Sequence, residues 1–78
     1  MTNSSLVYKP SKKEWKQLFK IASNQSIGQM INVMEALEMD ISFITEQFDM
    51  PLETLKKSNS KRIKHFIKSK MTKKLNIL

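Results

Sequence analysis

Cysteine is absent from this chain of 78 residues, and glycine, tryptophan, tyrosine and histidine occur once each. Without cysteine the chain has neither a disulfide nor a thiolate metal site, which suits a reducing compartment. No apolar run approaches the roughly 18 residues of a membrane span, and MTNSSLVYKPSKK at the N-terminus has no apolar core of a signal peptide. We therefore expect a cytoplasmic protein whose stability comes from packing alone.

The length of the chain limits its core. Seventy-eight residues form one domain at most, close to the size at which a single core is only marginally stable without further help. With no disulfide available, a partner or a second copy of the chain would supply additional buried surface. Partner binding or a homodimer is therefore an open expectation.

Charge is divided into three blocks along the chain. Residues 1–20 hold five lysines and one acid, residues 21–53 hold six acids and no base, and residues 54–78 hold nine Lys or Arg and no acid. The blocks carry +4, −6 and +9, which together give the net charge of +7. Such segregation indicates charged partners rather than a particular fold.

Helical signals begin after an expected N-terminal arm at residues 1–10, which lacks periodicity. Ser11 and Glu14 form an S-x-x-E capping box. The apolar residues that follow recur at helical spacing: Trp15, Leu18, Phe19 and Ala22. A second helix is predicted after a cap at Ser26 or Asn24, with an apolar stripe of Ile27, Met30, Ile31, Met34 and Leu37, broadened by Val33 and Ala36.

Two short helices and a basic one are predicted next. Asp40 is a suitable N-cap for a helix that turns Ile41, Ile44 and Phe48 inward, and Pro51 ends it and suits the first turn of another helix. The segment that follows either continues this helix or forms a last helix capped by Ser58 or Ser60, and its apolar side is Ile63, Phe66, Ile67 and Met71. We thus predict an all-α bundle of four or five short helices, with one helical domain over residues 11–70 and a basic C-terminal tail over 71–78.

The segment from Ile41 to Ser60 resembles a helix-turn-helix. Apolar positions are filled by Ile44, Phe48, Met50 and Leu55, and small or Thr positions by Thr45 and Thr54. Asp49 stands where Gly is usual, Pro51 where a Ser cap is usual, and Ser58 where an apolar residue is expected. Asp tolerates positive φ better than most residues, so the turn remains feasible. The pattern is similar to small regulators of phages and mobile elements and to the fourth region of bacterial sigma factors.

That resemblance implies a DNA-binding transcription regulator whose recognition helix begins at Pro51. The residues expected to face the major groove are Leu52, Glu53, Lys56, Lys57 and Asn59. Those expected to contact phosphates are Lys56, Lys57, Lys61, Arg62 and Lys64, with Lys9, Lys12 and Lys13 as a second cluster. The partner would be double-stranded DNA.

The acidic block supports a different function, a protein-binding module. Glu46, Asp49 and Glu53 surround the proposed DNA-facing corner and would repel phosphate. Together with Met50, in a methionine-rich segment, they suit a basic protein partner, for example RNA polymerase or another host enzyme inhibited by a phage product. Both functions stay open at this point.

Catalytic and metal-binding patterns are missing from the sequence. His65 is the only histidine and lies among lysines, and Glu35 and Glu38 share a helix face with no histidine or cysteine beside them. We therefore expect neither enzymatic activity nor a cofactor. The basic C-terminal helix is also of a type that binds anionic membrane surfaces, but its apolar face is needed for so small a core.

Overall fold

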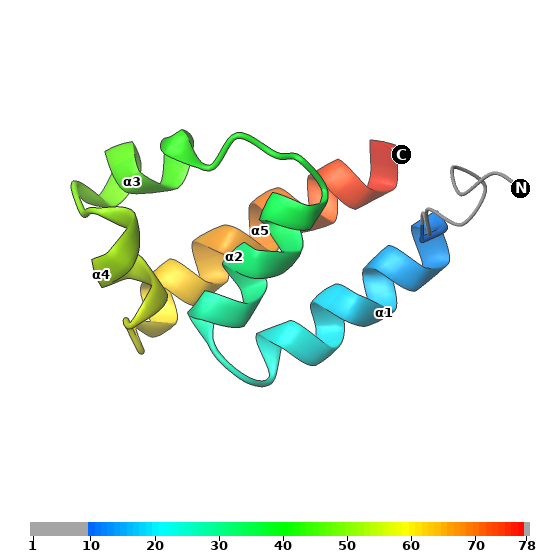
Figure 1. The fold of residues 1–78 in the computed structure, drawn as a ribbon, viewed down its shortest axis with the longest axis horizontal. Coiled ribbons are helices and arrows are strands. Elements are labelled where there is room, and N and C mark those ends of the chain that lie inside the picture. The colour runs from blue at the N-terminus through cyan, green and yellow to red at the C-terminus, as the bar shows by residue number, and fades with distance from the viewer. Residues whose placement is uncertain (1–9, 78) are drawn as a thin grey trace, which may run out of the picture.

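The computed structural model describes residues 10–77, and in that range it contains helices and connecting turns but no strand. The helices are α1 (Lys12–Ser23), α2 (Ile27–Ala36), α3 (Ser42–Phe48), α4 (Leu52–Lys56) and α5 (Lys61–Ile77). Helices α1, α2 and α5 pack against one another, and the short helices α3 and α4 form a corner at one end of them (Figure 1). The all-α prediction is confirmed. Nearly all of the expected N-terminal arm, including Lys9, lies outside the described residues.

Helix α1 begins at the predicted capping box. The Ser11 hydroxyl accepts a hydrogen bond from the Glu14 amide at 3.3 Å, and the Glu14 carboxylate accepts one from the Ser11 amide at 2.9 Å. Two backbone donors of the first turn are thereby satisfied. The prediction of this helix start is confirmed.

The buried face of α1 is rotated from the predicted stripe. Phe19, Ala22 and Ser23 are buried, whereas Leu18, predicted to face inward, is 42% exposed. Ser23 can be buried because its hydroxyl donates to the Lys20 carbonyl at 2.8 Å and leaves no polar group unsatisfied. The buried side of α1 therefore includes Ser23 in place of Leu18.

Helix α2 is the central helix and packs against α1, α4 and α5. Its cap is Ser26 rather than Asn24, with the Ser26 hydroxyl accepting from the Gln29 amide at 3.1 Å. The predicted stripe is confirmed for its four fully buried residues, Ile27, Met30, Ile31 and Met34. Leu37 is only half-buried, and Ala36, expected to widen the stripe, is exposed.

The single glycine lies where α2 and α4 approach each other closely. A Cβ atom at Gly28 would be 3.0 Å from the Lys56 carbonyl oxygen of α4. Such a distance is too short for a relaxed contact, so a larger residue would push the two helices apart. Gly28 therefore permits the packing that anchors α4 to the core.

Helices α3 and α4 form the predicted corner. Asp49 ends α3 in the left-handed region, with φ 51° and ψ 48°, as expected for the residue that replaces the usual glycine. Pro51 then occupies the N-cap position of α4, one residue before the first helical position at which it was expected. Ile44 and Leu55 are the fully buried residues of this corner.

The start of α3 differs slightly from the prediction. The helix begins at Ser42, so Ile41 rather than Asp40 occupies the N-cap position. Asp40 nevertheless caps the turn, because its carboxylate accepts a hydrogen bond from the Ser42 amide at 2.9 Å. The backbone hydrogen bond from Ser42, joined by one from its side chain, lowers the pKa of Asp40.

Aromatic rings attach α3 to α5. The Phe48 ring meets the Phe66 ring edge to face, with centroids 5.2 Å apart, and the Phe43 ring lies 6.1 Å from Phe66 at a tilt of 45°. The Lys70 ammonium lies 5.4 Å from the Phe66 centroid, within cation–π range. Helix α3 is thus attached through half-buried rings, whereas α2 packs closely against its neighbours.

Helix α5 starts separately from α4, after Ser60. The Ser60 hydroxyl accepts from the Ile63 amide at 3.3 Å, which selects Ser60 from the two predicted caps. The helix continues beyond residue 70, where a basic tail was expected to begin, to Ile77. Met71 and Leu75 are buried, so packing against the bundle extends the helix through most of the expected tail.

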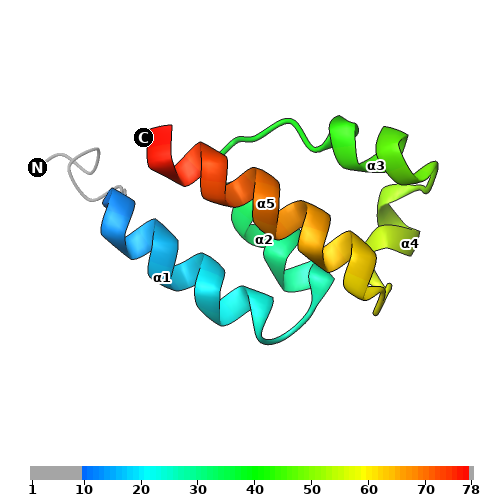
Figure 2. The ribbon, with the colours of Figure 1, turned by 180° about the vertical axis from the view of Figure 1, so that it is seen from behind.

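Helices α1 and α5 lie side by side and run in opposite directions (Figures 1 and 2). The start of α1 is therefore close to the end of α5. The Lys12 ammonium donates to the Asn76 carbonyl at 3.3 Å, where a cation suits the negative end of the helix. This contact helps to hold together the two helices on which most of the positive charge lies.

Candidate nucleic-acid interface

The predicted recognition helix is shorter in the structure than the resemblance implies. Helix α4 contains only five residues, Leu52–Lys56, and Lys57 is its C-cap. Asn59 therefore follows the helix in the connection to α5, and Lys61, Arg62 and Lys64 lie in the first turn of α5. The residues predicted to enter one groove from one helix are thus divided between two helices and their connection. Ser58, placed where the motif expects an apolar residue, explains this break, because its hydroxyl accepts from the Ser60 amide and turns the chain.

The predicted contact residues of α4 differ in exposure. Leu52 is half-buried against the core and Glu53 is exposed. The Lys56 ammonium lies 3.5 Å from a Glu35 carboxylate oxygen of α2. Both partners are partly exposed, so the pair is worth less than about 1 kcal/mol and a phosphate can compete with it.

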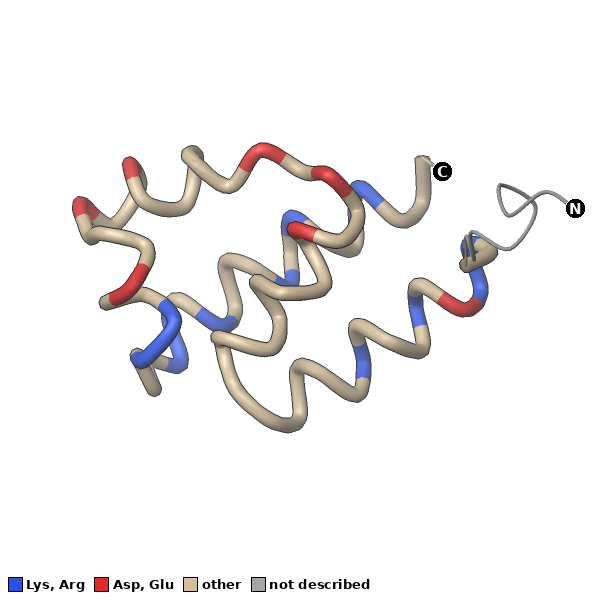
Figure 3. The backbone as a smooth tube through the Cα atoms, viewed as in Figure 1, with Lys and Arg blue, Asp and Glu red and all other residues tan. Residues whose placement is uncertain are grey.

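Most of the acidic residues lie at or near the corner. Figure 3 shows them along α3, on α4, at the end of α2 and along the connection from α2 to α3, with one more near the start of α1. Glu46, Asp49 and Glu53 are exposed and make no salt bridge with a described residue, whereas Met50 is half-buried on the core. The three carboxylates of the alternative protein-binding surface are thus exposed at the corner, whereas Met50 is largely a packing residue.

Two adjoining hollows lie at the start of α5. One, of about 250 Å³, is lined from the turn before α2 and from the connection to α5; its residues are Gln25, Ser26, Ile27, Ser58, Asn59, Lys61 and Lys64. The other, of about 330 Å³, is lined by Lys61, Lys64, His65 and Lys68. Because both contain Lys61 and Lys64, they form a continuous basic surface. Three of the predicted contact residues, Asn59, Lys61 and Lys64, are brought together there.

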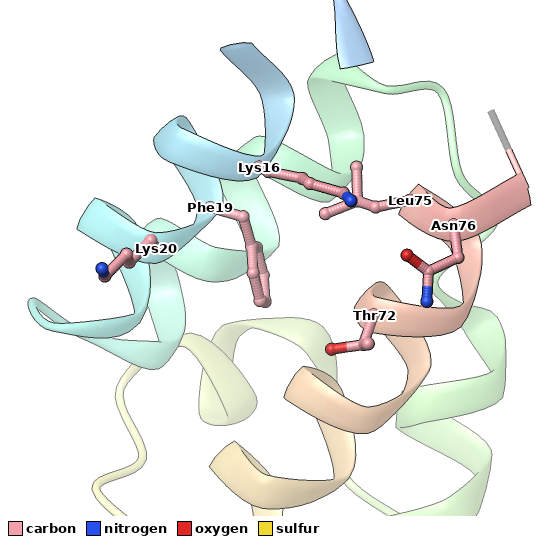
Figure 4. Close-up of a pocket in the computed structure, with 6 residues that line it drawn as sticks. All are labelled: Lys16, Phe19, Lys20, Thr72, Leu75 and Asn76. Carbon is pink, nitrogen blue, oxygen red and sulfur yellow. The ribbon is translucent and has the colours of Figure 1, made fainter. Parts of the chain in front are cut away.

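A third hollow, of about 280 Å³, lies farther along α5, where α1 faces it. Helix α1 contributes Lys16, Phe19 and Lys20, and α5 contributes Thr72, Leu75 and Asn76. Figure 4 shows the Phe19 ring extending from α1 toward α5, opposite the polar ends of Thr72 and Asn76. The hollow thus has an apolar floor and polar, positively charged edges.

Helix α1 and the middle of α5 add residues that the sequence interpretation did not include. Lys16, Lys20, Lys68, Thr72 and Asn76 line these hollows but were not predicted as site residues. The sequence did contain a pattern that identifies α1 as basic on one side, because Lys12, Lys16 and Lys20 are spaced by four residues and share one side of a helix. What the sequence does not show is that Lys16 and Lys20 share a hollow with Thr72, Leu75 and Asn76 of α5.

Within the described residues no cluster of His, Asp and Glu side chains could hold a metal ion. Buried side-chain nitrogen and oxygen atoms in the same range all have hydrogen-bond partners. None of the helices over residues 10–77 is long and apolar enough to cross a membrane.

Residues 10–77 thus form a small all-α bundle of five helices, with an acidic two-helix corner and a basic face over α1 and α5. Comparison of the chain with protein-family models, with curated proteins and with solved structures finds no match. Its function is therefore inferred from the arrangement of its own residues.

Proposed function

We propose that the protein is a small DNA-binding regulator, of the kind encoded by phages and mobile elements. The observation that carries the proposal is the basic surface that follows α4. Lys57, Lys61 and Arg62 are exposed and make no salt bridge with any described residue. Unpaired lysines and arginines on one surface are what a phosphate backbone requires, because binding releases the counterions condensed on DNA.

The corner between α3 and α4 supports the same proposal. Two short helices meet at a turn with left-handed Asp49, as in a helix-turn-helix, and the basic residues begin directly after the second helix. Because α4 is short and its Glu53 is exposed, phosphate contacts from residues 57–64 provide most of the affinity in this proposal. Base contacts are limited to the side chains near Lys56 and Asn59.

Duplex binding measured over a range of salt concentrations tests the proposal. We expect an affinity for a labelled duplex that falls steeply with salt. Lys57→Gln with Arg62→Gln should reduce the salt slope by about 0.9 for each phosphate that the variant no longer neutralises. The control is Lys70→Gln with Lys73→Gln, which removes the same charge from exposed lysines outside the three hollows. No duplex binding at ~50 mM salt, where binding is strongest, or equal losses in both double variants, would overturn the proposal.

The exposed carboxylates of the corner favour a second candidate, a non-enzymatic module that binds and inhibits a basic host protein. Its test is a tagged pull-down from host lysate, with and without nuclease, using Glu46→Lys, Asp49→Asn and Glu53→Lys together. A partner that survives nuclease treatment and no longer binds the variant supports this function. A partner that binds the variant equally well counts against it.

A further inference from the structure

The three hollows follow one side of α5, because the α5 residues Lys61, Lys64, Lys68, Thr72 and Asn76 that line them recur every three or four positions. We call these hollows together the α1–α5 groove. Its lysines are Lys16 and Lys20 on α1 and Lys61, Lys64 and Lys68 on α5. No acidic residue is among the residues that line the three hollows. None of the five lysines makes a salt bridge with a described carboxylate, so their charge is available to an external anion.

We propose that the α1–α5 groove holds the sugar–phosphate backbone of one nucleic-acid strand. The inference extends the proposed function, on which it rests in taking nucleic acid as the partner. It assigns to binding two lysines of α1, Lys16 and Lys20, and one of α5, Lys68. The strand belongs either to a duplex contacted at the corner or to single-stranded nucleic acid.

The geometry of the two lysine rows suits an extended polyanion. Along α1, Lys16 and Lys20 are one turn apart, about 6 Å along the axis, and along α5, Lys61 and Lys68 are about 10 Å apart. The two rows follow one another along the groove, because Lys61, Lys64 and Lys68 line its first two hollows, whereas Lys16 and Lys20 line the last one beside Thr72 and Asn76. A single phosphate would use one pair of these lysines, whereas a backbone uses both rows along their length.

The polar residues of the groove add hydrogen-bonding groups between the charges. Asn59, Ser58 and Gln25 line its start, and Thr72 and Asn76 line its end. Side chains of Ser, Thr, Asn and Gln are frequent partners of phosphate and sugar oxygens. Phe19 lies at the floor of the last hollow and leaves space of about 280 Å³ above it (Figure 4).

The concave shape of the groove favours a nucleic-acid strand over a flat anionic membrane as the partner. A helix bound to a membrane surface buries an apolar face in the lipid, but the apolar residues of α5 on its inner side, Ile63, Ile67, Met71 and Leu75, are buried in the core. The exposed side of the groove offers lysines and polar groups instead. The arrangement therefore favours a nucleic-acid backbone.

The test compares three double variants of the full chain for binding to a labelled 20-nucleotide single strand and to a duplex of that sequence. The groove variant is Lys16→Gln with Lys20→Gln, the corner variant is Lys57→Gln with Arg62→Gln, and the control is Lys70→Gln with Lys73→Gln. All six residues are exposed, so the fold is retained, which circular dichroism verifies. All three variants have the same net charge.

We expect the groove variant to neutralise two phosphates fewer than the native chain. At 0.1 M salt this lowers affinity for the single strand about 25-fold, with a salt slope smaller by about 1.4, because each phosphate contributes about 0.7. In the control the slope falls by less than a quarter of that amount. If the groove variant and the control lose affinity equally, the positive charge acts only through the overall field, and the inference is overturned.

The other outcomes separate this inference from the proposed function. If the corner variant weakens duplex binding and the groove variant does not, the groove inference is refuted and the proposed function as a DNA-binding regulator stands. Single-strand binding that needs the groove, with no duplex binding at low salt, supports the groove and refutes the duplex regulator. If the protein binds vesicles of phosphatidylserine and phosphatidylcholine, loses this binding in the groove variant and does not bind nucleic acid, the inference is refuted.

Discussion

The pair of helices α2 and α5 and the corner of α3 and α4 are held in different ways. Each helix of the first pair contributes four buried residues to the core, whereas α3 contributes only Ile44 and α4 only Leu55. The corner otherwise depends on half-buried side chains, among them Phe43 and Phe48. The basic groove thus lies beside the best-packed helices, whereas the exposed carboxylates of Glu46, Asp49 and Glu53 lie on the more lightly packed corner (Figure 3).

This difference matters for binding. A charged surface on closely packed helices keeps its lysines in a defined arrangement, which suits repeated phosphate binding. A corner with few buried side chains opens at lower free energy and adapts more easily to a partner. Unequal packing of the two regions therefore agrees with rigid phosphate binding on one face and adjustable contacts on the other.

The largest expected effect compares two isoleucines, both with no exposed surface. Ile67→Ala, in α5, should lower the free energy of unfolding by about 2–5 kcal/mol. Ile44→Ala, in α3, should lower it less, because its half-buried neighbours can move into the space and the cavity collapses. Urea denaturation followed by circular dichroism measures both.

Some alanine variants of so small a domain will be too unstable for this measurement. Ile67→Val and Ile44→Val remove one methylene each and should cost about 0.5–1.5 kcal/mol, with the same ranking. An equal or greater loss of stability at Ile44 would show that the corner is packed as rigidly as α2 and α5. The proposed difference between the two regions would then be wrong.

A second comparison uses the two described residues with positive φ, Asp49 at the corner and Glu38 after α2. Glycine relieves the steric cost of this conformation, and Asp bears that cost more readily than Glu. We therefore expect Glu38→Gly to stabilise the protein by about 0.5–1 kcal/mol, and Asp49→Gly by less. Thermal unfolding of the two variants gives the ranking.

Charge is a second difference between those variants and the native chain. Glu38→Gln and Asp49→Asn remove the same charges while keeping a side chain, so they serve as matched controls. If Glu38→Gln stabilises as much as Glu38→Gly, relief of acidic repulsion explains the gain. The backbone explanation then fails for that position.

Local features of the fold were predictable from the sequence. The capping box at Ser11 and Glu14 and the left-handed turn at Asp49 depend on residues within a few positions of each other, and both predictions are confirmed. Helix ends that depend on distant packing were less predictable. The extension of α5 to Ile77 follows from burial of Met71 and Leu75 against the bundle, which no local signal specifies.

The candidate site was predictable only in part, for the same reason. Lys61 and Lys64 were identified because they follow the motif in sequence. The pairing of Lys56 with Glu35, and the position of Lys16 opposite α5, join residues that are far apart along the chain. Such pairings depend on how the helices pack, and one sequence shows the rows of charge but not which rows face each other.

The smallest expected effect concerns pH and the turn that leads into the corner. The Ser42 amide bonded to the Asp40 carboxylate lowers the pKa of Asp40 in the folded protein. The ionised carboxylate therefore adds stability above its unfolded pKa of about 3.9, and this stability is lost as pH falls through the lower folded pKa.

In Asp40→Asn a neutral amide oxygen keeps the hydrogen bond and does not titrate. We expect the native chain to be slightly more stable than this variant near neutral pH, with the difference shrinking below about pH 4. Urea unfolding at several pH values measures it, and a difference that stays constant into strong acid would show that the Asp40 charge does not stabilise the corner.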